Sequence, residues 1–280
     1  MSGKAPFPTW GLGETNFKET LMNAPAVHLN KPVREQVSKE EWEVRVNLAA
    51  CYRLMHEFGM VEMIANHISA RVPGTENEFL INPYGMLYDE ITASSLIRID
   101  LEGNVLFNTS DYGVNQAGYV IHSAIHAARH DVDCVIHTHT LAGMSVSAHK
   151  QGLLPLAQSA MRFAEIAYHD YEGPALRLDE RERLVQSIGQ CEALIMRNHG
   201  LLTVGDSIPE CFNNHYRLER ACQLQVMTLS CNTEINLPPD EVVQSTYGML
   251  SKGGAQRRRG LLEWPSLLRR LDRIDPSYAS

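Results

Sequence analysis

The first well-patterned segment of the chain runs from Trp42 to Phe58, where hydrophobic residues recur with a helical period. Ser38 and Glu41 precede it with the spacing of a capping box, the side-chain pattern that opens many helices. Gly59 follows it, and glycine is the residue that most often ends a helix. We therefore expect a helix that begins after Ser38 and ends at Gly59.

Between Asn66 and Val105 the pattern changes to short runs typical of strands, which read HISARV, EFLINP and SLIRIDLEGNVL. Turns are expected between them at 83–85 and 102–104, where proline, glycine and asparagine gather. Helical spacing returns from about Gln116 to Arg129, and DCVIHTH follows as a buried strand.

The second half of the chain adds two more strands and two helices. ALIMRNHGLLTVG is read as two strands joined through 198–200, and Pro209 opens a helix that runs to about Ser230. The C-terminal LLEWPSLLRRLDRI is expected to form a short helix broken near Pro265.

Strands and helices alternate irregularly, and hairpin-like pairs are present. This favours a single α/β domain with a mixed sheet over a doubly wound parallel sheet. We expect an extended N-terminal arm over residues 1–36, the α/β domain over 37–250 and a helical tail over 251–280.

Charge and composition restrict the class of partner. The net charge of −8 argues against nucleic acid or an anionic membrane as the main partner. No G-x-G-x-x-G or P-loop pattern indicates nucleotide binding. The six cysteines form no C-x-x-C pair, and there is neither a leader-like N-terminus nor an apolar run of membrane-spanning length. We therefore expect a cytoplasmic protein with reduced thiols that acts on a small molecule.

Two histidines end the DCVIHTH strand. Side chains two positions apart on a strand share a face, so His137 and His139 present their imidazoles side by side. Two such nitrogens can hold a divalent metal, but they also fit a pair of hydrogen-bonded core histidines. His199, just before a glycine at the tip of a strand–turn–strand, is a candidate for a third ligand.

A second histidine pair, His122 and His126, lies four residues apart on one helix face. This spacing can bind zinc, but Ser123 stands where the H-E-x-x-H motif has its glutamate. We expect His122 to support or face a substrate and His126 to be a satisfied helix histidine.

Three segments in order resemble the class II aldolase/adducin family: ANHISARV with FLINPYGMLYDEI, VNQAGYVIHSAIHAARHDVDCVIHTHTLAGMSVSA, and ALIMRNHGLLTVGDSIPECFNNHYRLERACQLQ. The resemblance spans residues 40 to 232. It implies a three-layer α/β/α domain and a homotetramer with active sites between subunits. It also implies that His137, His139 and His199 bind a divalent metal, which is zinc in the aldolases, with manganese or iron as alternatives.

The catalytic part of the family pattern is absent. Sugar-phosphate aldolases carry Ser-Ser-Glu four to six residues before the histidine that matches His122, and this chain reads Gln116-Ala117-Gly118 there. Ala117 cannot bind a phosphate oxygen and Gly118 cannot transfer a proton. The loss of a positioned acid/base costs on the order of a hundredfold in rate. Aldol cleavage of a sugar phosphate by the family mechanism is therefore not expected.

The remaining polar and aromatic residues of the matched segments are candidates for substrate binding or proton transfer. As catalytic candidates we name His122 and Tyr168 as proton donors and Glu165 as a fourth ligand or a relocated acid/base. The substrate-binding candidates are Asn66, Tyr84, Gly85, Gln116 and Arg162, with Phe163 and Tyr171 as further aromatic neighbours; ordinary packing or surface ion pairs are the alternative for each.

These features predict a metal-dependent carbon–carbon lyase, of decarboxylase or aldolase type, for a small non-phosphorylated oxo- or hydroxy-acid, and the tyrosines of the matched segments are compatible with an aromatic one. A metal with open positions can chelate such an acid and stabilise the charge left when the bond breaks. A non-haem iron oxygenase on the same three-histidine platform is one alternative. A non-catalytic scaffold similar to the adducin head domain is the other.

Overall fold

The computed structural model describes residues 31–173, 179–251 and 259–280, so most of the expected arm over 1–36 lies outside the described residues. The strands are β1 (His67–Arg71), β2 (Glu78–Ile81), β3 (Ile97–Asp100), β4 (Val105–Phe107), β5 (Cys134–Thr138), β6 (Ala167–His169), β7 (Ala193–Met196) and β8 (Gly200–Gly205). The helices are η1 (Val33–Glu35), α2 (Lys39–Glu57), α3 (Gln116–Ala128), α4 (Leu141–Ser147), α5 (Gln158–Met161), α6 (Glu180–Ile188), α7 (Ile208–Ser230), α8 (Asp240–Leu250), α9 (Trp264–Ile274) and η2 (Pro276–Ala279).

The strands form one sheet in the order β4-β3-β2-β1-β5-β8-β7-β6. All neighbouring strands pair antiparallel except β6 and β7, which are parallel. The predicted mixed, largely antiparallel sheet is therefore confirmed. Its central strand is β5, which pairs with β1 on one side and β8 on the other.

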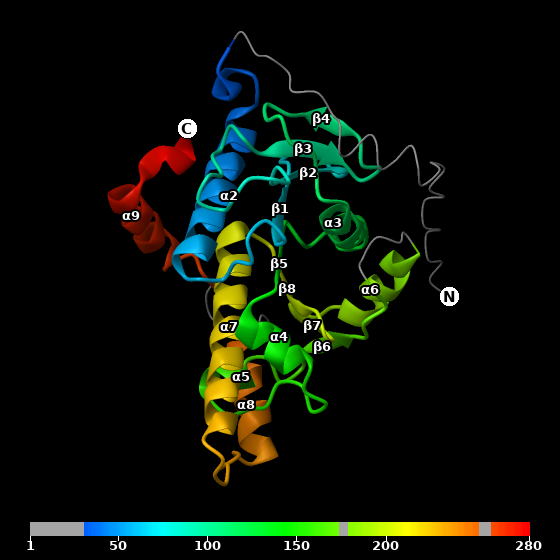
Figure 1. The fold of residues 1–280 in the computed structure, drawn as a ribbon, viewed down its shortest axis with the longest axis vertical. Coiled ribbons are helices and arrows are strands. Elements are labelled where there is room, and N and C mark those ends of the chain that lie inside the picture. The colour runs from blue at the N-terminus through cyan, green and yellow to red at the C-terminus, as the bar shows by residue number, and fades with distance from the viewer. Residues whose placement is uncertain (1–30, 174–178, 252–258) are drawn as a thin grey trace.

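Helices cover both faces of the sheet, and this confirms the three-layer α/β/α architecture (Figure 1). On one face α2, α7 and α9 bury a cluster that includes Ile68 of β1 and Ile136 of β5. On the other face α3 and α6 bury a second cluster with Val135 of β5. Because neighbouring residues of a strand point to opposite faces, β5 contributes to both clusters.

The start of α2 follows the capping prediction in part. The Ser38 Oγ accepts the Glu41 N–H at 3.0 Å, which satisfies one of the free amides at the helix start. The Glu41 carboxylate does not return to Ser38, as a full capping box requires. It is buried and pairs with Arg45 and Arg98, both at 2.8 Å. Gly59 follows the helix with φ of +67°.

The C-terminal segment differs from its prediction. Pro265 does not break the helix but lies in the first turn of the continuous helix α9, where a missing N–H costs no hydrogen bond. The segment packs on α2: Trp264 donates its Nε1–H to Asn47 Oδ1 at 2.6 Å, and Ala93 donates to the Tyr278 carbonyl at 2.8 Å. These contacts join the end of the chain to the core around α2.

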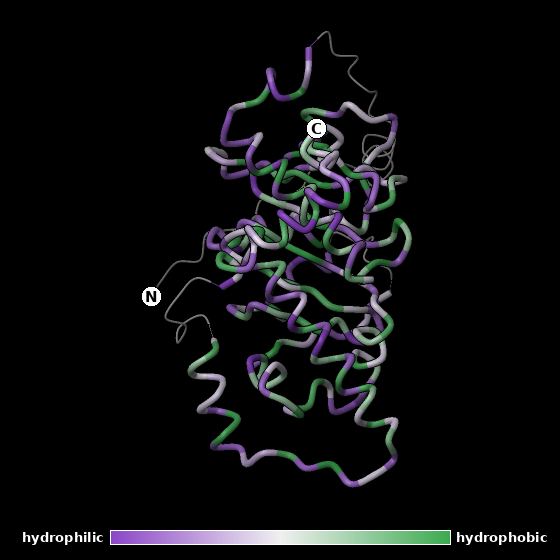
Figure 2. The backbone as a smooth tube through the Cα atoms, turned by 90° about the vertical axis from the view of Figure 1, so that its left-hand side faces the viewer, coloured by the Kyte–Doolittle hydropathy of each residue, from purple (hydrophilic) through white to green (hydrophobic). Residues whose placement is uncertain are grey.

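Seven short or peripheral elements were not predicted from the sequence: η1, α4, α5, β6, α6, α8 and η2. The helix α8 lies at the far end of α7 and packs against α5, and the tube of this end of the molecule carries both hydrophobic and hydrophilic residues (Figure 2). None of the helices in the described ranges is both long and apolar enough to cross a membrane.

A buried histidine links the central strands to α7. His215 lies between two threonine hydroxyls, with Nε2 2.7 Å from Thr138 of β5 and Nδ1 2.9 Å from Thr203 of β8. Burial lowers the pKa of His215 from 6.5 to about 3. Its pKa is thus lower in the folded than in the unfolded chain. Above about pH 6.5 the imidazole is neutral in both states, and the stability of the folded chain is unaffected by its titration. As the pH falls from 6.5 toward 3, only the unfolded chain binds a proton, so the free energy of unfolding decreases.

We predict that His215→Gln makes folding less sensitive to acid. Between pH 7.5 and 5, the wild-type free energy of unfolding should fall by up to about 2 kcal/mol more than that of the variant. The reason is that His215 binds a proton in the unfolded chain but stays neutral in the folded one. Denaturant unfolding at the two pH values measures this difference. His130→Gln, at an exposed turn, is the matched control and should behave as wild type. Equal losses in wild type and His215→Gln would contradict the prediction.

Candidate metal centre

The alternation along β5 orients two of the three predicted ligands. Val135 points into the cluster under α3 and α6, and His137, two residues later, points to the same face. Thr138 points to the opposite face, where its hydroxyl contacts His215. His139 follows the last residue of the strand and brings its imidazole next to that of His137, with ring centroids 4.7 Å apart.

The third predicted ligand comes from the turn between β7 and β8. Asn198 adopts a left-handed conformation, with φ of +54°, and His199 stands at the tip. Gly200 begins β8 so close to β5 that a Cβ there would lie 2.2 Å from the Thr138 carbonyl oxygen. A glycine is therefore needed for the turn to approach β5 and to place His199 beside His139.

The three imidazoles converge on one point through their Nε2 atoms. The Nε2–Nε2 distances are 2.9 Å between His137 and His139, 3.0 Å between His139 and His199, and 3.3 Å between His137 and His199. Three nitrogens bound to one zinc ion at tetrahedral angles lie about 3.3 Å apart. Among the described residues, these three histidines form the one group of at least three His, Cys, Asp or Glu side chains that could share an ion.

The outer nitrogens of two ligands have partners that leave Nε2 free to bind an ion. His137 Nδ1 lies 2.9 Å from the Leu201 carbonyl oxygen, so Nδ1 carries the proton and donates it. His139 Nδ1 lies 2.8 Å from Glu62 Oε2. Pairs of this kind orient metal-binding histidines and fix their tautomer. Burial, followed by the neighbouring histidines, lowers the pKa of His137 well below 6.5 and that of His199 to about 4. Neutral imidazoles are the form that binds a metal, so the residues present fit a divalent ion.

Asn66 supports this arrangement. Its Oδ1 accepts the backbone N–H of Glu62 at 2.6 Å and thereby holds the segment whose carboxylate contacts His139. The side-chain Nδ2 of Asn66 is buried and has no hydrogen-bond partner among the described residues. Asn66, a predicted substrate-binding residue, thus has one polar atom that orients Glu62 and one buried donor that no described residue satisfies.

A fourth histidine lies beside the triad. His67 of β1 is the cross-strand partner of His137, and the two ring centroids are 4.9 Å apart. Its Nδ1 lies 2.7 Å from His122 Nε2, whereas its Nε2 makes no hydrogen bond with a described residue. The ring packs on Gly118 of α3, where a Cβ would lie 2.9 Å from His67 Cγ. Sequence reasoning missed His67, and its only signal was its place next to Asn66.

His122 lies behind His67 and does not contact the triad directly. Its Nδ1 is 2.5 Å from Ser69 Oγ, and the same hydroxyl is 2.8 Å from His126 Nε2. All three side chains are fully buried between β1 and α3. The structure therefore connects His122 to the triad through His67, and it makes His126 the inner end of a chain of polar contacts.

Three other predicted residues do not reach the triad within one chain. The half-buried Tyr168 uses its hydroxyl to accept the Leu153 N–H at 3.0 Å. Glu165 Oε2 accepts the Tyr247 hydroxyl at 3.0 Å, and Arg162 donates to Asn213 at 2.9 Å. Glu165 and Arg162 line a cavity of about 300 Å³ together with Phe163, and none of the triad histidines lines it.

The predicted turn residues Tyr84 and Gly85 lie in the loop between β2 and β3. Gly85 has φ of +139°, and a Cβ there would overlap the ring of Tyr112, so only glycine fits. Tyr84 is partly exposed and donates its N–H to the Gly113 carbonyl at 2.8 Å. Gln116 is the first residue of α3, two positions before the Gly118 that supports His67.

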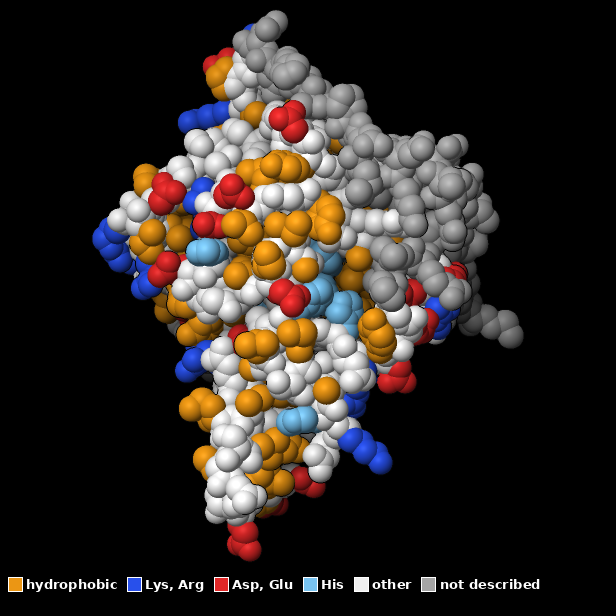
Figure 3. Space-filling view, in the orientation of Figure 1, with side chains coloured by type: hydrophobic (Ala, Val, Ile, Leu, Met, Phe, Trp, Pro, Cys, Tyr) orange, Lys and Arg blue, Asp and Glu red, His pale blue; other side chains and the backbone are white. Residues whose placement is uncertain are grey.

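The surface around the triad is open and largely hydrophobic. Histidine atoms reach the surface near the middle of the face in Figure 3, with an acidic side chain beside them and hydrophobic side chains around them. Tyr171 lies at this surface, with its ring centroid 6.2 Å from that of His199.

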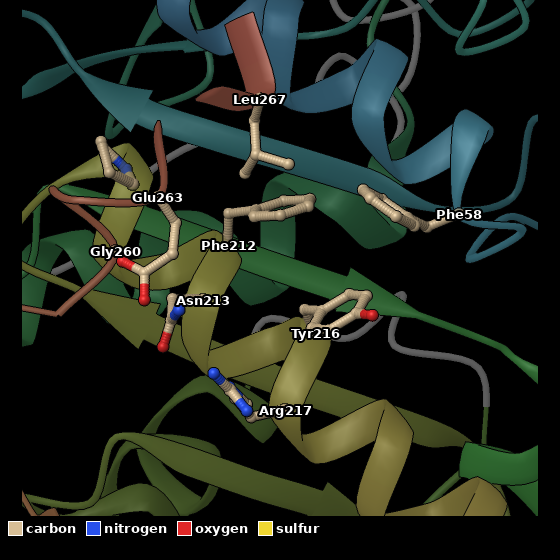
Figure 4. Close-up of a pocket in the computed structure, with 9 residues that line it drawn as sticks. Phe58, Phe212, Asn213, Tyr216, Arg217, Gly260, Glu263 and Leu267 are labelled. Atoms are coloured by element: carbon tan, nitrogen blue, oxygen red, sulfur yellow. The ribbon is translucent and has the colours of Figure 1, made fainter. Parts of the chain in front are cut away.

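A separate cavity of about 190 Å³ lies between α2, α7 and the C-terminal segment. Phe58, Phe212, Tyr216 and Leu267 surround it in Figure 4, and Arg217 and Glu263 stand at its edge. It shares no lining residue with the metal centre.

Residues 46–226 match the sequence profile of the "Class II Aldolase and Adducin N-terminal domain". A Caulobacter vibrioides protein with the name "Putative aldolase class 2 protein" is 51% identical over 249 residues, which cover 88% of this chain and 96% of that protein. Rat alpha-adducin is 47% identical over 196 residues, which cover 69% of this chain and 26% of the adducin.

Solved structures show the same fold. An aldolase II superfamily protein from Pseudomonas syringae superposes with a TM-score of 0.84 at 46% identity, over 89% of this chain and 100% of that one. L-fuculose 1-phosphate aldolase from Glaciozyma antarctica superposes with a TM-score of 0.74 at 25% identity, over 90% and 96%. On its sequence and its fold, the chain belongs to the class II aldolase and adducin family.

Proposed function

We propose that this protein is a metal-dependent carbon–carbon lyase that acts on a small, non-phosphorylated oxo- or hydroxy-acid. The observation that carries the proposal is the convergence of three Nε2 atoms, two of them with their outer nitrogens already oriented by Leu201 and Glu62. Zinc is the ion that this set of ligands favours, and manganese and iron are the alternatives.

The helix that starts beside the triad supports a substrate without phosphate. Gln116, Ala117 and Gly118 form its first turn and carry neither a hydroxyl nor a carboxylate. The space above Gly118 is taken by the imidazole of His67. A neutral imidazole beside the ligands offers little attraction for a phosphate, which needs arginine, lysine or several N–H donors.

The chain's own residues supply binding and proton transfer around the ion. A divalent ion held by the three histidines supplies the positive charge that stabilises the electron pair left when a carbon–carbon bond breaks. The His67 ring lies 4.9 Å from that of His137 and uses its Nδ1 for His122, so its Nε2 is the atom that would give a proton to the product carbon or take one from a hydroxyl. His122 positions His67 through Nδ1, and Asn66 offers its free Nδ2–H to an oxygen of the substrate.

The exposed surroundings of the triad support sites shared between subunits of a homotetramer. Met63, next to Glu62, is 77% exposed, and Leu141, two residues after His139, is 82% exposed. Exposed hydrophobic side chains beside the triad leave the triad open to water. A neighbouring subunit that covers these side chains would exclude water from the triad. The roles expected for Tyr168, Glu165 and Arg162 require such a neighbour, because these residues do not reach the triad of their own chain.

Two alternatives each have an observation in their favour. The three neutral ligands would leave an iron ion with positions for oxygen and a chelating acid, which is the arrangement of an oxygenase. The identity with alpha-adducin favours a non-catalytic scaffold. The oriented triad argues against a scaffold. A scaffold needs only packing at this place, and apolar residues would pack better than histidines that Leu201 and Glu62 hold in position.

The reaction type is tested by supplying 2-oxo and 2-hydroxy acids to the metal-loaded protein without oxygen. The proposal predicts release of carbon dioxide or an aldehyde that depends on the ion and disappears in His199→Ala. Oxygen consumption that depends on iron and matches product formation would establish the oxygenase instead. A stable oligomer that neither turns over any of the acids nor binds an ion would establish the scaffold.

We predict that Glu62→Gln weakens metal binding about 10- to 100-fold, because it removes the carboxylate that orients His139. The affinity is measured by competition with a chromophoric chelator. Glu78→Gln is the matched control, since that carboxylate of β2 pairs with Arg98 at 2.7 Å and lies two strands from β5, and the variant should bind metal as wild type does. An unchanged affinity in Glu62→Gln would contradict the assignment of Glu62.

We predict that Gly118→Ala lowers kcat about a hundredfold while metal binding is retained, because the new Cβ displaces the His67 ring and with it the proton-transferring atom. His67→Gln should have the same effect. Gly248→Ala, where a Cβ meets no atom within 4 Å, is the control for the exchange itself. Full turnover by Gly118→Ala and His67→Gln would exclude His67 from the chemistry.

A further inference from the structure

Two threonines alternate with two of the triad histidines in the run His137-Thr138-His139-Thr140. The histidines reach the triad, whereas both threonines are buried and bond to residues of α7. The paired part of β5 ends at Thr138, and Thr140 is the N-cap of α4. His139 therefore stands at the junction of a strand and a helix, one residue past the part of β5 that its neighbouring strands hold.

Helix α7 holds both threonines. It contacts β5 and lies alongside α4 (Figure 1). Its His215 places Nε2 2.7 Å from the Thr138 hydroxyl, and its Glu219 accepts a hydrogen bond from the Thr140 hydroxyl. Residues four apart on a helix lie on the same face, so one face of α7 holds the residues on both sides of His139.

Glu219 is a buried acid, and helix capping does not explain its place. The residue is 3% exposed, and the described groups that donate to its carboxylate are the Thr140 hydroxyl and the Gln223 amide, both neutral. Burial of an acid costs free energy that an apolar side chain would not cost. Thr140 caps α4 by accepting the Gly143 N–H at 3.1 Å, and a hydroxyl oxygen can do so without any partner for its proton. The bond to Glu219 therefore adds a constraint on Thr140 that the cap does not need.

We propose that Glu219 is a positioning residue of the metal centre. It holds Thr140 against α7 on one side of His139, while His215 holds Thr138 on the other side. With both neighbours fixed, the His139 backbone directs its imidazole toward His137 and His199. This inference rests on the proposed function, since it assigns Glu219 a role in the binding of the ion.

The contact between His139 and Glu62 does not fix His139 by itself. The Glu62 side chain is half exposed, and water competes for a hydrogen bond at the surface. The bond between Thr140 and Glu219 is buried, where a hydrogen bond is stronger because water is absent. The two contacts act on different parts of the residue, since Glu62 meets the imidazole and Glu219 restrains the backbone through Thr140.

The test removes either partner of the bond and then restores it with a conservative residue. The zinc affinity, measured by competition with a chromophoric chelator, should fall about tenfold in Glu219→Leu, the lower end of the range for groups that orient a ligand. Glu219→Leu leaves the Thr140 cap intact, so this loss cannot come from the start of α4. Thr140→Val should show a similar loss. Glu219→Gln keeps an acceptor and Thr140→Ser keeps the hydroxyl, so both should bind zinc as the wild type does.

A spectroscopic readout separates positioning from stability. Cobalt(II) can replace zinc, and its visible absorption depends on the arrangement of its ligands. The spectrum of the cobalt-loaded protein should change in Glu219→Leu and Thr140→Val and be retained in Glu219→Gln and Thr140→Ser. Tyr278→Phe is the control for stability, because it removes a hydrogen bond of 2.8 Å from a buried tyrosine to Asp272 near the end of the chain. It should lower the stability and leave the zinc affinity and the cobalt spectrum unchanged.

The outcomes for this inference and for the proposed function differ. A wild-type affinity and spectrum in Glu219→Leu would overturn the positioning role and leave the proposed function standing. Equal losses in Thr140→Val and Thr140→Ser would also overturn it, because the hydroxyl would then not be the cause. The predicted losses in a protein that turns over none of the acids would support the positioning role while the proposed reaction fails. If the wild type bound neither zinc nor cobalt, both would fail.

Discussion

The arrangement of the three histidines depends on the antiparallel pairing of β5 with β1 and β8. Hydrogen bonds on both edges of β5 fix its register, and this register determines which of its side chains point to each face of the sheet. The same pairing brings His67 opposite His137 and the Leu201 carbonyl next to His137 Nδ1. A shift of one residue would turn His137 to the α7 face, where Thr138 now meets His215.

Those parts of the fold and site that depend on local patterns could be predicted from the sequence. The Ser38 cap, the long helix α7 opened by Pro209 and the buried strand β5 each follow from residues close together in the chain. The three histidines that converge in the fold could be named for the same reason, since the H-x-H spacing is local and the N-H-G turn is short. The family resemblance then joined the two motifs.

What the sequence did not reveal depends on contacts across long separations. Glu62 lies 77 residues from His139, and His67 lies 55 residues from His122. At such separations neither pair forms a sequence motif. Their meeting depends on the register of β1 with β5 and on the room that Gly118 provides. For the same reason Arg162, which looks suitable in sequence, is directed to α7, where it donates to Asn213.

The central claim is that the three histidines hold a divalent ion whose remaining positions are open to a substrate. X-ray absorption spectroscopy of protein purified without chelator tests it most directly, because it reports the ion and its neighbours together. The account predicts an ion with three imidazole nitrogens at about 2.0–2.1 Å and solvent oxygen in the rest of its shell, and this shell should change when a 2-oxo acid is added. A protein without an ion, or an ion closed by a fourth protein ligand and indifferent to the acid, would contradict it.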